Sequence, residues 1–190
     1  MTITIQQIAN SAPKEYRIEI DGQTRYYAYV RFRKRHTFID LVTVRGVQPI
    51  VSLEIKKEAR SFKLPAYYIL GLGEKAIACK PGPRRENRYQ LVYEKDTYDI
   101  IGHRNSFASI FKNEQQIGLL ANQTIVTFLQ GYKYSLDVDF DCDLRIALSL
   151  ALIWDNFSFN SEGIFPQLIF NIGQLWEIRK RDVHWRARSE

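Results

Sequence analysis

The first half of the chain alternates apolar and polar residues in the manner of short β-strands. Tyr16, Ile18 and Ile20 alternate with charged residues, and Asp21-Gly22 follows as a hairpin turn signal. Such alternation places every second side chain on one face of a sheet, so it predicts half-buried strands. Further strand signals cover Arg25 to Phe32, Thr37 to Val44, Ile50 to Ile55, Ser61 to Leu64, Tyr67 to Leu70 and Ala76 to Cys79.

Strand signals continue at regular intervals in the second half, after a loop rich in Pro and Gly from Lys80 to Arg88. They cover Tyr89 to Tyr93, Tyr98 to Gly102, Phe107 to Phe111, Gln115 to Leu119, Thr124 to Leu129 and Tyr132 to Val138. Lys112-Asn113-Glu114 predicts a tight turn between two of them. About a dozen strands spaced roughly ten residues apart are typical of a meandering sandwich or barrel.

The pattern changes abruptly after residue 140. The run LRIALSLALIWDNF, from Leu144 to Phe157, is rich in strong helix formers, and Asp141 or Asp143 can cap its N-terminus. Apolar residues cover nearly its whole circumference, which only Arg145 and Ser149 interrupt. A helix that is apolar all round is surrounded by protein or lipid, and this one is shorter than the ~18 residues that cross a bilayer. The sequence therefore predicts a helix buried among the strands.

Many consecutive strands followed by one wholly apolar helix is an uncommon order. Residues 136 to 159, LDVDFDCDLRIALSLALIWDNFSF, resemble the last strand and central helix of the superfamily that includes the tubby C-terminal domain, the LURP-one-related proteins and the phospholipid scramblases. Residues 98 to 118, YDIIGHRNSFASIFKNEQQIG, resemble a strand–turn–strand segment of the same superfamily. The resemblance covers residues 16 to 159 and rests on patterns of hydrophobicity.

The resemblance implies a mainly β fold, in which a closed antiparallel barrel of about twelve strands surrounds a central apolar C-terminal helix. Residues 1–15 are then expected to form an N-terminal extension, and residues 160–190 a C-terminal extension whose basic tail frays. The superfamily has no single activity: tubby domains bind phosphoinositides, scramblases are linked to lipid movement and plant members to defence. The fold alone therefore implies no function.

The composition is that of one ordinary globular domain. The chain has 190 residues, of which 45% are hydrophobic and 25% charged, so a core can form without disulfides or metals. Its two cysteines, Cys79 and Cys142, are too few for a disulfide scaffold, and we expect both to be reduced. The N-terminal residues lack the features of a signal peptide. We expect a cytoplasmic protein, either free or peripheral at a membrane.

An acidic run precedes the helix: Asp137, Asp139, Asp141 and Asp143. Alternate carboxylates can ligate a hard cation such as Ca²⁺, and the run falls where scramblases are said to carry a calcium motif. However, Cys142 and Leu148 stand where an EF-hand loop requires Gly and Glu. A solvated strand end followed by a helix cap accounts for the run without a metal. We therefore expect no metal and no cofactor.

Basic residues outnumber acidic ones by 27 to 21 and concentrate in three segments. These are Arg31, Arg33, Lys34 and Arg35 at a strand end and turn, Arg84 and Arg85 in the Pro-Gly loop, and Arg179, Lys180 and Arg181 in the tail. Together they form a candidate binding face for anionic phospholipid headgroups, because each cation contributes about 1 kcal/mol near an anionic surface. Solvated strands and loops also carry Lys and Arg, so a scaffold or protein-interaction domain without lipid affinity is the alternative.

Other classes of function have weaker support. Nucleic-acid binding uses the same basic and aromatic residues, but no RRM, KH or zinc signature is present. The three histidines, His36, His103 and His184, form no metal or catalytic pattern, and no GxSxG motif exists. A hydrolase needs a pocket with converging polar groups. We therefore expect a non-enzymatic binding domain with no catalytic residues.

Overall fold

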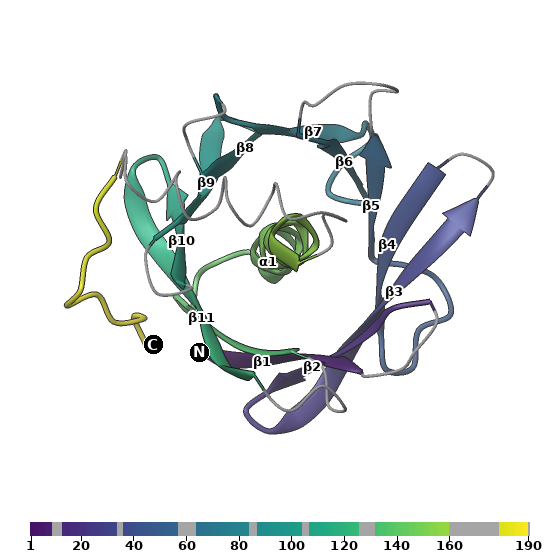
Figure 1. Ribbon diagram of the computed structural model, residues 1–190, viewed down its shortest axis with the longest axis horizontal. Coiled ribbons are helices and arrows are strands. Elements are labelled where there is room, and N and C mark those ends of the chain that lie inside the picture. The colour runs from purple at the N-terminus through teal and green to yellow at the C-terminus, as the bar shows by residue number, and fades with distance from the viewer. Residues whose placement is uncertain are drawn as a thin grey trace.

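The strands close into a barrel around a single helix in a computed structural model of the chain (Figure 1). The structure describes residues 1–8, 13–33, 36–56, 64–83, 87–103, 107–125, 132–159 and 179–189. These residues form twelve strands and one helix: β1 (Thr2–Ile8), β2 (Glu15–Ile20), β3 (Gln23–Arg33), β4 (His36–Thr43), β5 (Val51–Lys56), β6 (Ala66–Leu70), β7 (Ile77–Pro81), β8 (Arg88–Tyr93), β9 (Asp96–Gly102), β10 (Phe107–Lys112), β11 (Gln115–Ile125), β12 (Tyr132–Val138) and α1 (Leu144–Phe159).

Each strand pairs antiparallel with the next strand in sequence, and β1 pairs with β12 to close the barrel. Alternation along the strands sends large apolar side chains inward, and Ile18, Ile39, Leu53 and Ile100 are all fully buried there. Closure gives every described strand a paired neighbour on both sides, so none of these strands is an edge strand of an open sheet. The mainly β class and the closed barrel predicted for this chain are confirmed.

Two predicted turns are confirmed by their backbone conformation. Asp21 and Gly22 have φ of 50° and 76°, and Asn113 and Glu114 have φ of 47° and 75°. Positive φ at both central residues matches the twist of the flanking strands in a two-residue hairpin. These turns fix the register of β2 with β3 and of β10 with β11.

The N-terminal residues belong to the barrel, which corrects the expectation of an N-terminal extension over residues 1–15. Thr2–Ile8 forms β1, with Ile3 and Ile5 buried in the core. The N-terminal ammonium of Met1 also donates to the Val138 carbonyl at 3.0 Å. The partner strand β12 lies more than a hundred residues away in sequence. A local pattern of two inward isoleucines is too short to reveal this pairing.

Some strand boundaries also differ from the predicted ones. The segments predicted as separate strands from Gln115 and from Thr124 are joined, because β11 runs continuously from Gln115 to Ile125. Residues 126–129 of the second segment lie outside the described residues, as do residues 61–63 of the strand predicted from Ser61.

The helix α1 lies along the inside of the barrel, which confirms the prediction for Leu144 to Phe157 (Figure 1). Asp143 caps it, because its Oδ1 accepts a hydrogen bond from the backbone N–H of Arg145 at 2.8 Å. The two polar interruptions are both accommodated. Arg145 remains partly exposed and pairs with Asp143 at 2.7 Å, and the Ser149 hydroxyl donates to the Arg145 carbonyl at 2.6 Å.

A third polar group interrupts the helix, and the sequence does not reveal its importance. Asp155 is only 2% exposed, so this carboxyl group lies within the apolar core. The hydroxyl of the buried Tyr16 donates to its Oδ2 at 2.6 Å, which ties α1 to β2. The next residue, Asn156, donates to the Tyr67 hydroxyl at 2.6 Å and links α1 to β6. Polar side chains therefore fix how the C-terminal part of the helix sits in the barrel.

The end of the chain packs against the outside of the barrel, which corrects the expectation of a frayed tail. Residues 179–189, drawn in yellow in Figure 1, lie beside β10 and β11. The Trp185 indole donates to the Gln116 carbonyl at 2.9 Å. We call residues 179–189 the strap. Among the helices in the described part of the chain, none has the length and apolar character required to cross a bilayer.

Candidate functional site

The hairpin formed by β3 and β4 carries the first predicted basic cluster. Arg33 pairs with His36 at its end, and residues 34 and 35 connect them. Along the inward-facing positions of β3, Ala28 is 0% exposed and Val30 7%, whereas Phe32 is 73% exposed. The hairpin thus extends beyond the core, and a large aromatic side chain is left in solvent next to Arg33.

Arg31 is held on the outer wall of the hairpin. Its guanidinium pairs with Asp40, a buried carboxylate that also accepts a hydrogen bond from Ser52 Oγ at 2.6 Å. The same guanidinium lies over the Phe38 ring, 4.5 Å from its centroid. Much of the charge of Arg31 is therefore compensated within the protein. Arg33, by contrast, is exposed.

The topology brings several other basic positions to the same end of the barrel as this hairpin. Because consecutive strands are antiparallel, the ends of β3, β5 and β7 and the start of β8 lie together. We call this end, which carries Arg33, Lys56, Lys80 and Arg88, the hairpin end. Two of these charges are partly engaged: Lys56 lies over the Tyr68 ring at 4.2 Å, and Arg88 is 3.9 Å from Asp99.

Four predicted site residues lie outside the described residues: Lys34, Arg35, Arg84 and Arg85. The described residues that flank them, Arg33 and His36 on one side and Pro81 on the other, belong to strands that end at the hairpin end.

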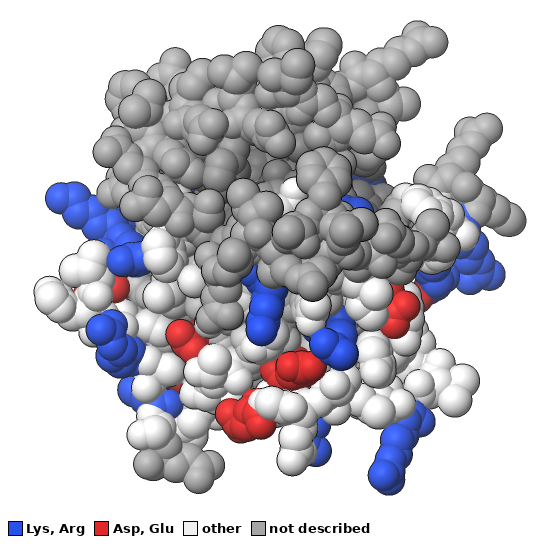
Figure 2. Space-filling view, turned by 60° about the horizontal axis from the view of Figure 1, so that its bottom comes forward, with Lys and Arg blue, Asp and Glu red and all other residues white. Residues whose placement is uncertain are grey.

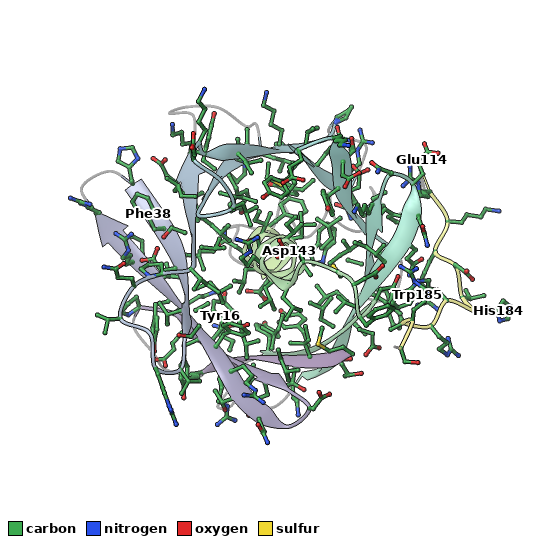
Figure 3. All side chains as sticks on the ribbon, turned by 180° about the vertical axis from the view of Figure 1, so that it is seen from behind. Tyr16, Phe38, Glu114, Asp143, His184 and Trp185 are labelled. Carbon is green, nitrogen blue, oxygen red and sulfur yellow. The ribbon has the colours of Figure 1, made fainter. Side chains whose placement is uncertain are left out.

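The tail cluster lies on a different wall. Figure 3 shows Phe38 of the hairpin on one side of the barrel and Trp185 of the strap on the opposite side. Arg179 lies over the Phe111 ring and 3.6 Å from Glu114, and Arg181 lies over the Phe107 ring. Lys180 is exposed. The described members of the predicted set therefore fall into two separate groups and not one face.

Figure 2 shows another face of the barrel, turned forward from the lower edge of Figure 1. Lys and Arg side chains are scattered over it, and acidic side chains lie between them. This face does not present a basic patch, so the basic positions of the described residues gather at the hairpin end and in the tail cluster.

Each of the four aspartates of the acidic run binds a structural partner within the protein. Asp137 accepts a hydrogen bond from Thr2 Oγ1 at 2.6 Å, and Asp143 caps α1. Asp139 and Asp141 both bind the strap through Arg188. The described residues contain no group of three or more His, Cys, Asp or Glu arranged to hold a metal ion.

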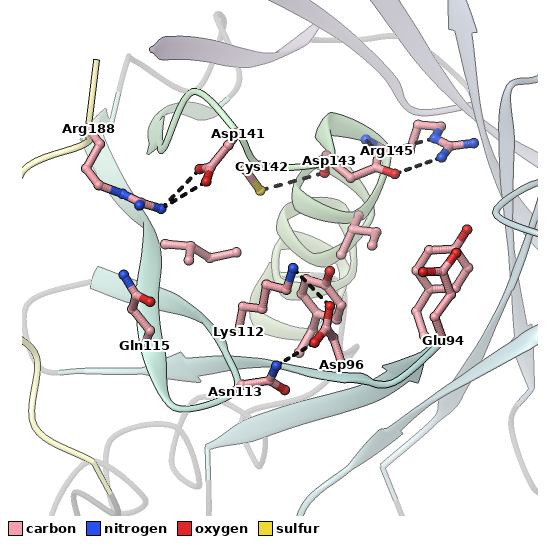
Figure 4. A pocket seen from close by; sticks show the side chains of 14 residues that line it. Glu94, Asp96, Lys112, Asn113, Gln115, Asp141, Cys142, Asp143, Arg145 and Arg188 are labelled. Atoms are coloured by element: carbon pink, nitrogen blue, oxygen red, sulfur yellow. Dashed lines mark hydrogen bonds and ion pairs between the residues drawn. The ribbon is translucent and has the colours of Figure 1, made fainter. Parts of the chain in front are cut away.

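A polar cavity of about 550 Å³ opens at the opposite end of the barrel, above the N-terminus of α1 (Figure 4). Three ion pairs line it: Lys112 with Asp96 at 2.9 Å, Arg145 with Asp143 at 2.7 Å, and Arg188 with Asp141 at 3.1 Å. They come from different parts of the chain: the first joins β10 to β9, the second lies at the start of α1, and the third joins the strap to the segment before α1. We call this opening the barrel-end cavity.

The titratable groups of the barrel-end cavity are adjusted by their neighbours. Burial acts against ionisation of Asp143, but hydrogen bonds from Arg145 outweigh it and lower the pKa of that carboxyl. Hydrogen bonds from Lys112 and Asn113 lower the pKa of Asp96. Burial, and then the three surrounding aspartates, raise the pKa of the Cys142 thiol to about 12. The thiol is therefore protonated at neutral pH and is not an activated nucleophile.

Comparison with known proteins adds no relatives: no protein-family model, no curated protein and no solved structure matches this chain. The resemblance to the tubby, LURP-one and scramblase superfamily stays a prediction. Function must therefore be argued from the side chains themselves.

Two features of the surface escape prediction from the sequence. The barrel-end cavity combines residues from four segments that lie far apart along the chain, and no local motif marks it. The strap site depends on Gln116, which no motif marks, and on Asp139, which the acidic run suggested for a cation and not for a contact with the strap. The spacing of Trp185 and Arg188 in a basic segment is the one signal that points to anchoring, since both residues often bind through specific side-chain contacts.

Proposed function

We propose that this protein is a non-enzymatic domain that binds anionic phospholipid surfaces through the hairpin end. The observation that carries the proposal is the 73% exposure of Phe32 next to Arg33, at the end of a hairpin that extends past the core. An exposed aromatic ring among cations suits a membrane interface, where the ring enters the headgroup region and the cations meet phosphates.

The charge distribution along the barrel axis supports this orientation. Lys56, Lys80 and Arg88 lie at the same end as the hairpin, whereas the cations that line the cavity at the opposite end are paired with aspartates. An anionic surface attracts the cations of the first end more strongly than the paired charges of the second, so the domain is expected to approach with its hairpin end forward.

Binding to vesicles tests the proposal. We expect co-sedimentation with phosphatidylcholine vesicles to increase with their phosphatidylserine content and to decrease with salt. Phe32→Ser should weaken binding about tenfold or more, because it removes one aromatic anchor, and Arg33→Gln should weaken it about fivefold.

Matched variants at other sites control for general effects. Val92→Ser removes another exposed apolar side chain, which is 58% exposed on the barrel wall. Arg45→Gln removes an exposed charge at the opposite end of the barrel. Neither should change vesicle binding. Wild-type sedimentation that is independent of both lipid charge and salt would contradict the proposal.

A scaffold role without lipid affinity is the second candidate, and a groove of about 470 Å³ favours it. Tyr27 and Tyr29 stack along β3 on one side of this groove, and the loop after β4 forms the other side. Val47 in that loop is 97% exposed and Val44 is 48% exposed. Such exposed apolar residues suit a protein partner. Absence of vesicle binding by the wild-type protein would favour this second role.

A further inference from the structure

The strap is an extended segment. It is attached to the barrel mainly by side-chain hydrogen bonds and not by strand pairing. Within it, the Trp185 amide donates to the Asp182 carbonyl at 3.3 Å, and the His184 amide donates to Asp182 Oδ1 at 2.9 Å. No strand pairing joins the strap to β10 or β11 among the described residues. A segment held in this way opens at lower free energy than the paired strands beneath it.

The middle of the strap is bound at an irregularity of the sheet. The β10–β11 register shifts at Ile110 and Phe111, so Ile117 is an extra residue in β11. Next to this bulge, Gln116 holds the strap twice: its Oε1 accepts from the Asp182 amide at 3.3 Å, and its carbonyl accepts from the Trp185 indole at 2.9 Å.

The end of the strap is bound by Arg188. Its backbone N–H and its Nε donate to the two oxygens of Asp139 at 2.7 and 2.9 Å, and its carbonyl accepts from the Phe140 amide at 3.2 Å. Its guanidinium also reaches Asp141 at 3.1 Å. Asp139 is only 1% exposed, and a buried carboxylate is costly without such a partner. This arrangement makes Arg188 the strongest anchor of the strap.

Arg188 also forms part of the wall of the barrel-end cavity (Figure 4). The other anchors of the strap line only the groove beneath it and do not reach the cavity. Cys142, by contrast, lines the cavity directly beside Asp141. Detachment of Arg188 would thus remove the side chain that bounds the cavity on the strap side and would leave the closed barrel intact.

We propose that the strap is a gate on one side of the barrel-end cavity, with Arg188 as the side chain that holds that side closed. Release of Arg188 from Asp139 and Asp141 widens the opening of the cavity on the strap side while the twelve-stranded barrel stays folded. The ion pair with Asp141 is solvent-exposed, so salt weakens it and shifts the gate toward the open state. This inference does not depend on lipid binding.

The two cysteines of the chain provide a native test. Cys142 is partly buried in the cavity, and Cys79 is fully buried in the barrel core, so the first reports on the gate and the second on unfolding. The rate of modification by a maleimide is measured at each cysteine by mass spectrometry, at mildly alkaline pH. Arg188→Gln should accelerate modification of Cys142 about tenfold, because it removes charged hydrogen bonds, and should leave Cys79 unreactive.

Arg186→Gln is the matched control. It removes the same charge two residues away, from a side chain whose hydrogen bond is to the strap's own Trp185 carbonyl. Its Cys142 rate should equal that of the wild type. Salt should accelerate Cys142 modification in the wild type but not in Arg188→Gln.

The inference fails if Arg188→Gln and Arg186→Gln give the same Cys142 rate. If Arg188→Gln does not fold, Arg188→Lys keeps the charge and loses the geometry of the Asp139 contact, and it should give an intermediate rate. Parallel acceleration of Cys79 and Cys142 in Arg188→Lys would equally overturn the gate, because the strap would then be an inseparable part of the barrel.

Discussion

At the scale of the residue, Asp155 shows how one polar side chain specifies the position of an otherwise apolar helix. Burial raises the pKa of its carboxyl, and hydrogen bonds from Tyr16 and Tyr134 and the charge of Lys14 oppose that rise only in part. The sequence indicates a buried helix but does not show that the Asp155 carboxyl positions it. Its importance depends on where Tyr16 lies, more than a hundred residues away.

The raised pKa of Asp155 predicts a particular dependence of stability on pH. The folded state binds the proton more tightly than the unfolded state, so the contribution of Asp155 to stability is fully present below about pH 4 and is lost as pH rises through the folded-state pKa. Each unit of separation between the two pKa values is worth about 1.4 kcal/mol.

Urea unfolding at a series of pH values checks this prediction. The free energy of unfolding of the wild type, relative to that of Asp155→Asn, should decrease as pH rises above about 4. A relative stability that increases over this range would show that the Asp155 carboxylate is stabilised, and not destabilised, by burial.

At the scale of the element, the fit of α1 to the strands depends on close contacts that hydrophobic patterns do not encode. A Cβ atom on Gly102 of β9 would lie 2.3 Å from the Trp154 ring, so the helix contacts the strand backbone here. Beyond it, Trp154, Phe157 and Tyr89 pack ring against ring. The alternation of apolar residues predicts which side chains face inward, whereas these contacts depend on the third dimension.

Gly102→Ala is expected to destabilise the barrel by about 1–3 kcal/mol, because the added methyl overlaps a rigid ring at the backbone of β9. Thermal unfolding measures the effect. Gly22→Ala provides a comparison, since no atom lies within 4 Å of a Cβ there and its cost arises from positive φ alone. If Trp154→Phe, which leaves space for the new methyl, does not restore part of the stability of Gly102→Ala, the contact is not the cause.

At the scale of the whole molecule, the strand order, the turns and the buried helix follow from local sequence patterns, because alternation, turn chemistry and helix propensity all agree. The features that the sequence does not predict depend on closure of the barrel. β1 joins the barrel only through β12, and the two described basic groups are separated because the strap and the hairpin lie on opposite walls. Clusters of the same charge along the sequence therefore need not meet in the folded barrel.

Closure also gives the molecule two functionally different ends. The hairpin end presents Phe32 and several cations, and the other end presents the barrel-end cavity with its ion pairs. The central claim is that the hairpin end contacts an anionic surface while the cavity end faces away from it.

Environment-sensitive labels at the two ends test this claim most directly. In a Cys142→Ser background, a nitrobenzoxadiazole dye is attached at Thr37→Cys, which pairs with Phe32, or at Gln48→Cys, an exposed position in the loop after β4 at the opposite end. Addition of vesicles containing phosphatidylserine should increase the emission and shift it to the blue for the label at residue 37, and should leave the label at residue 48 unchanged. Equal responses at both positions, or no response at residue 37, would contradict the account.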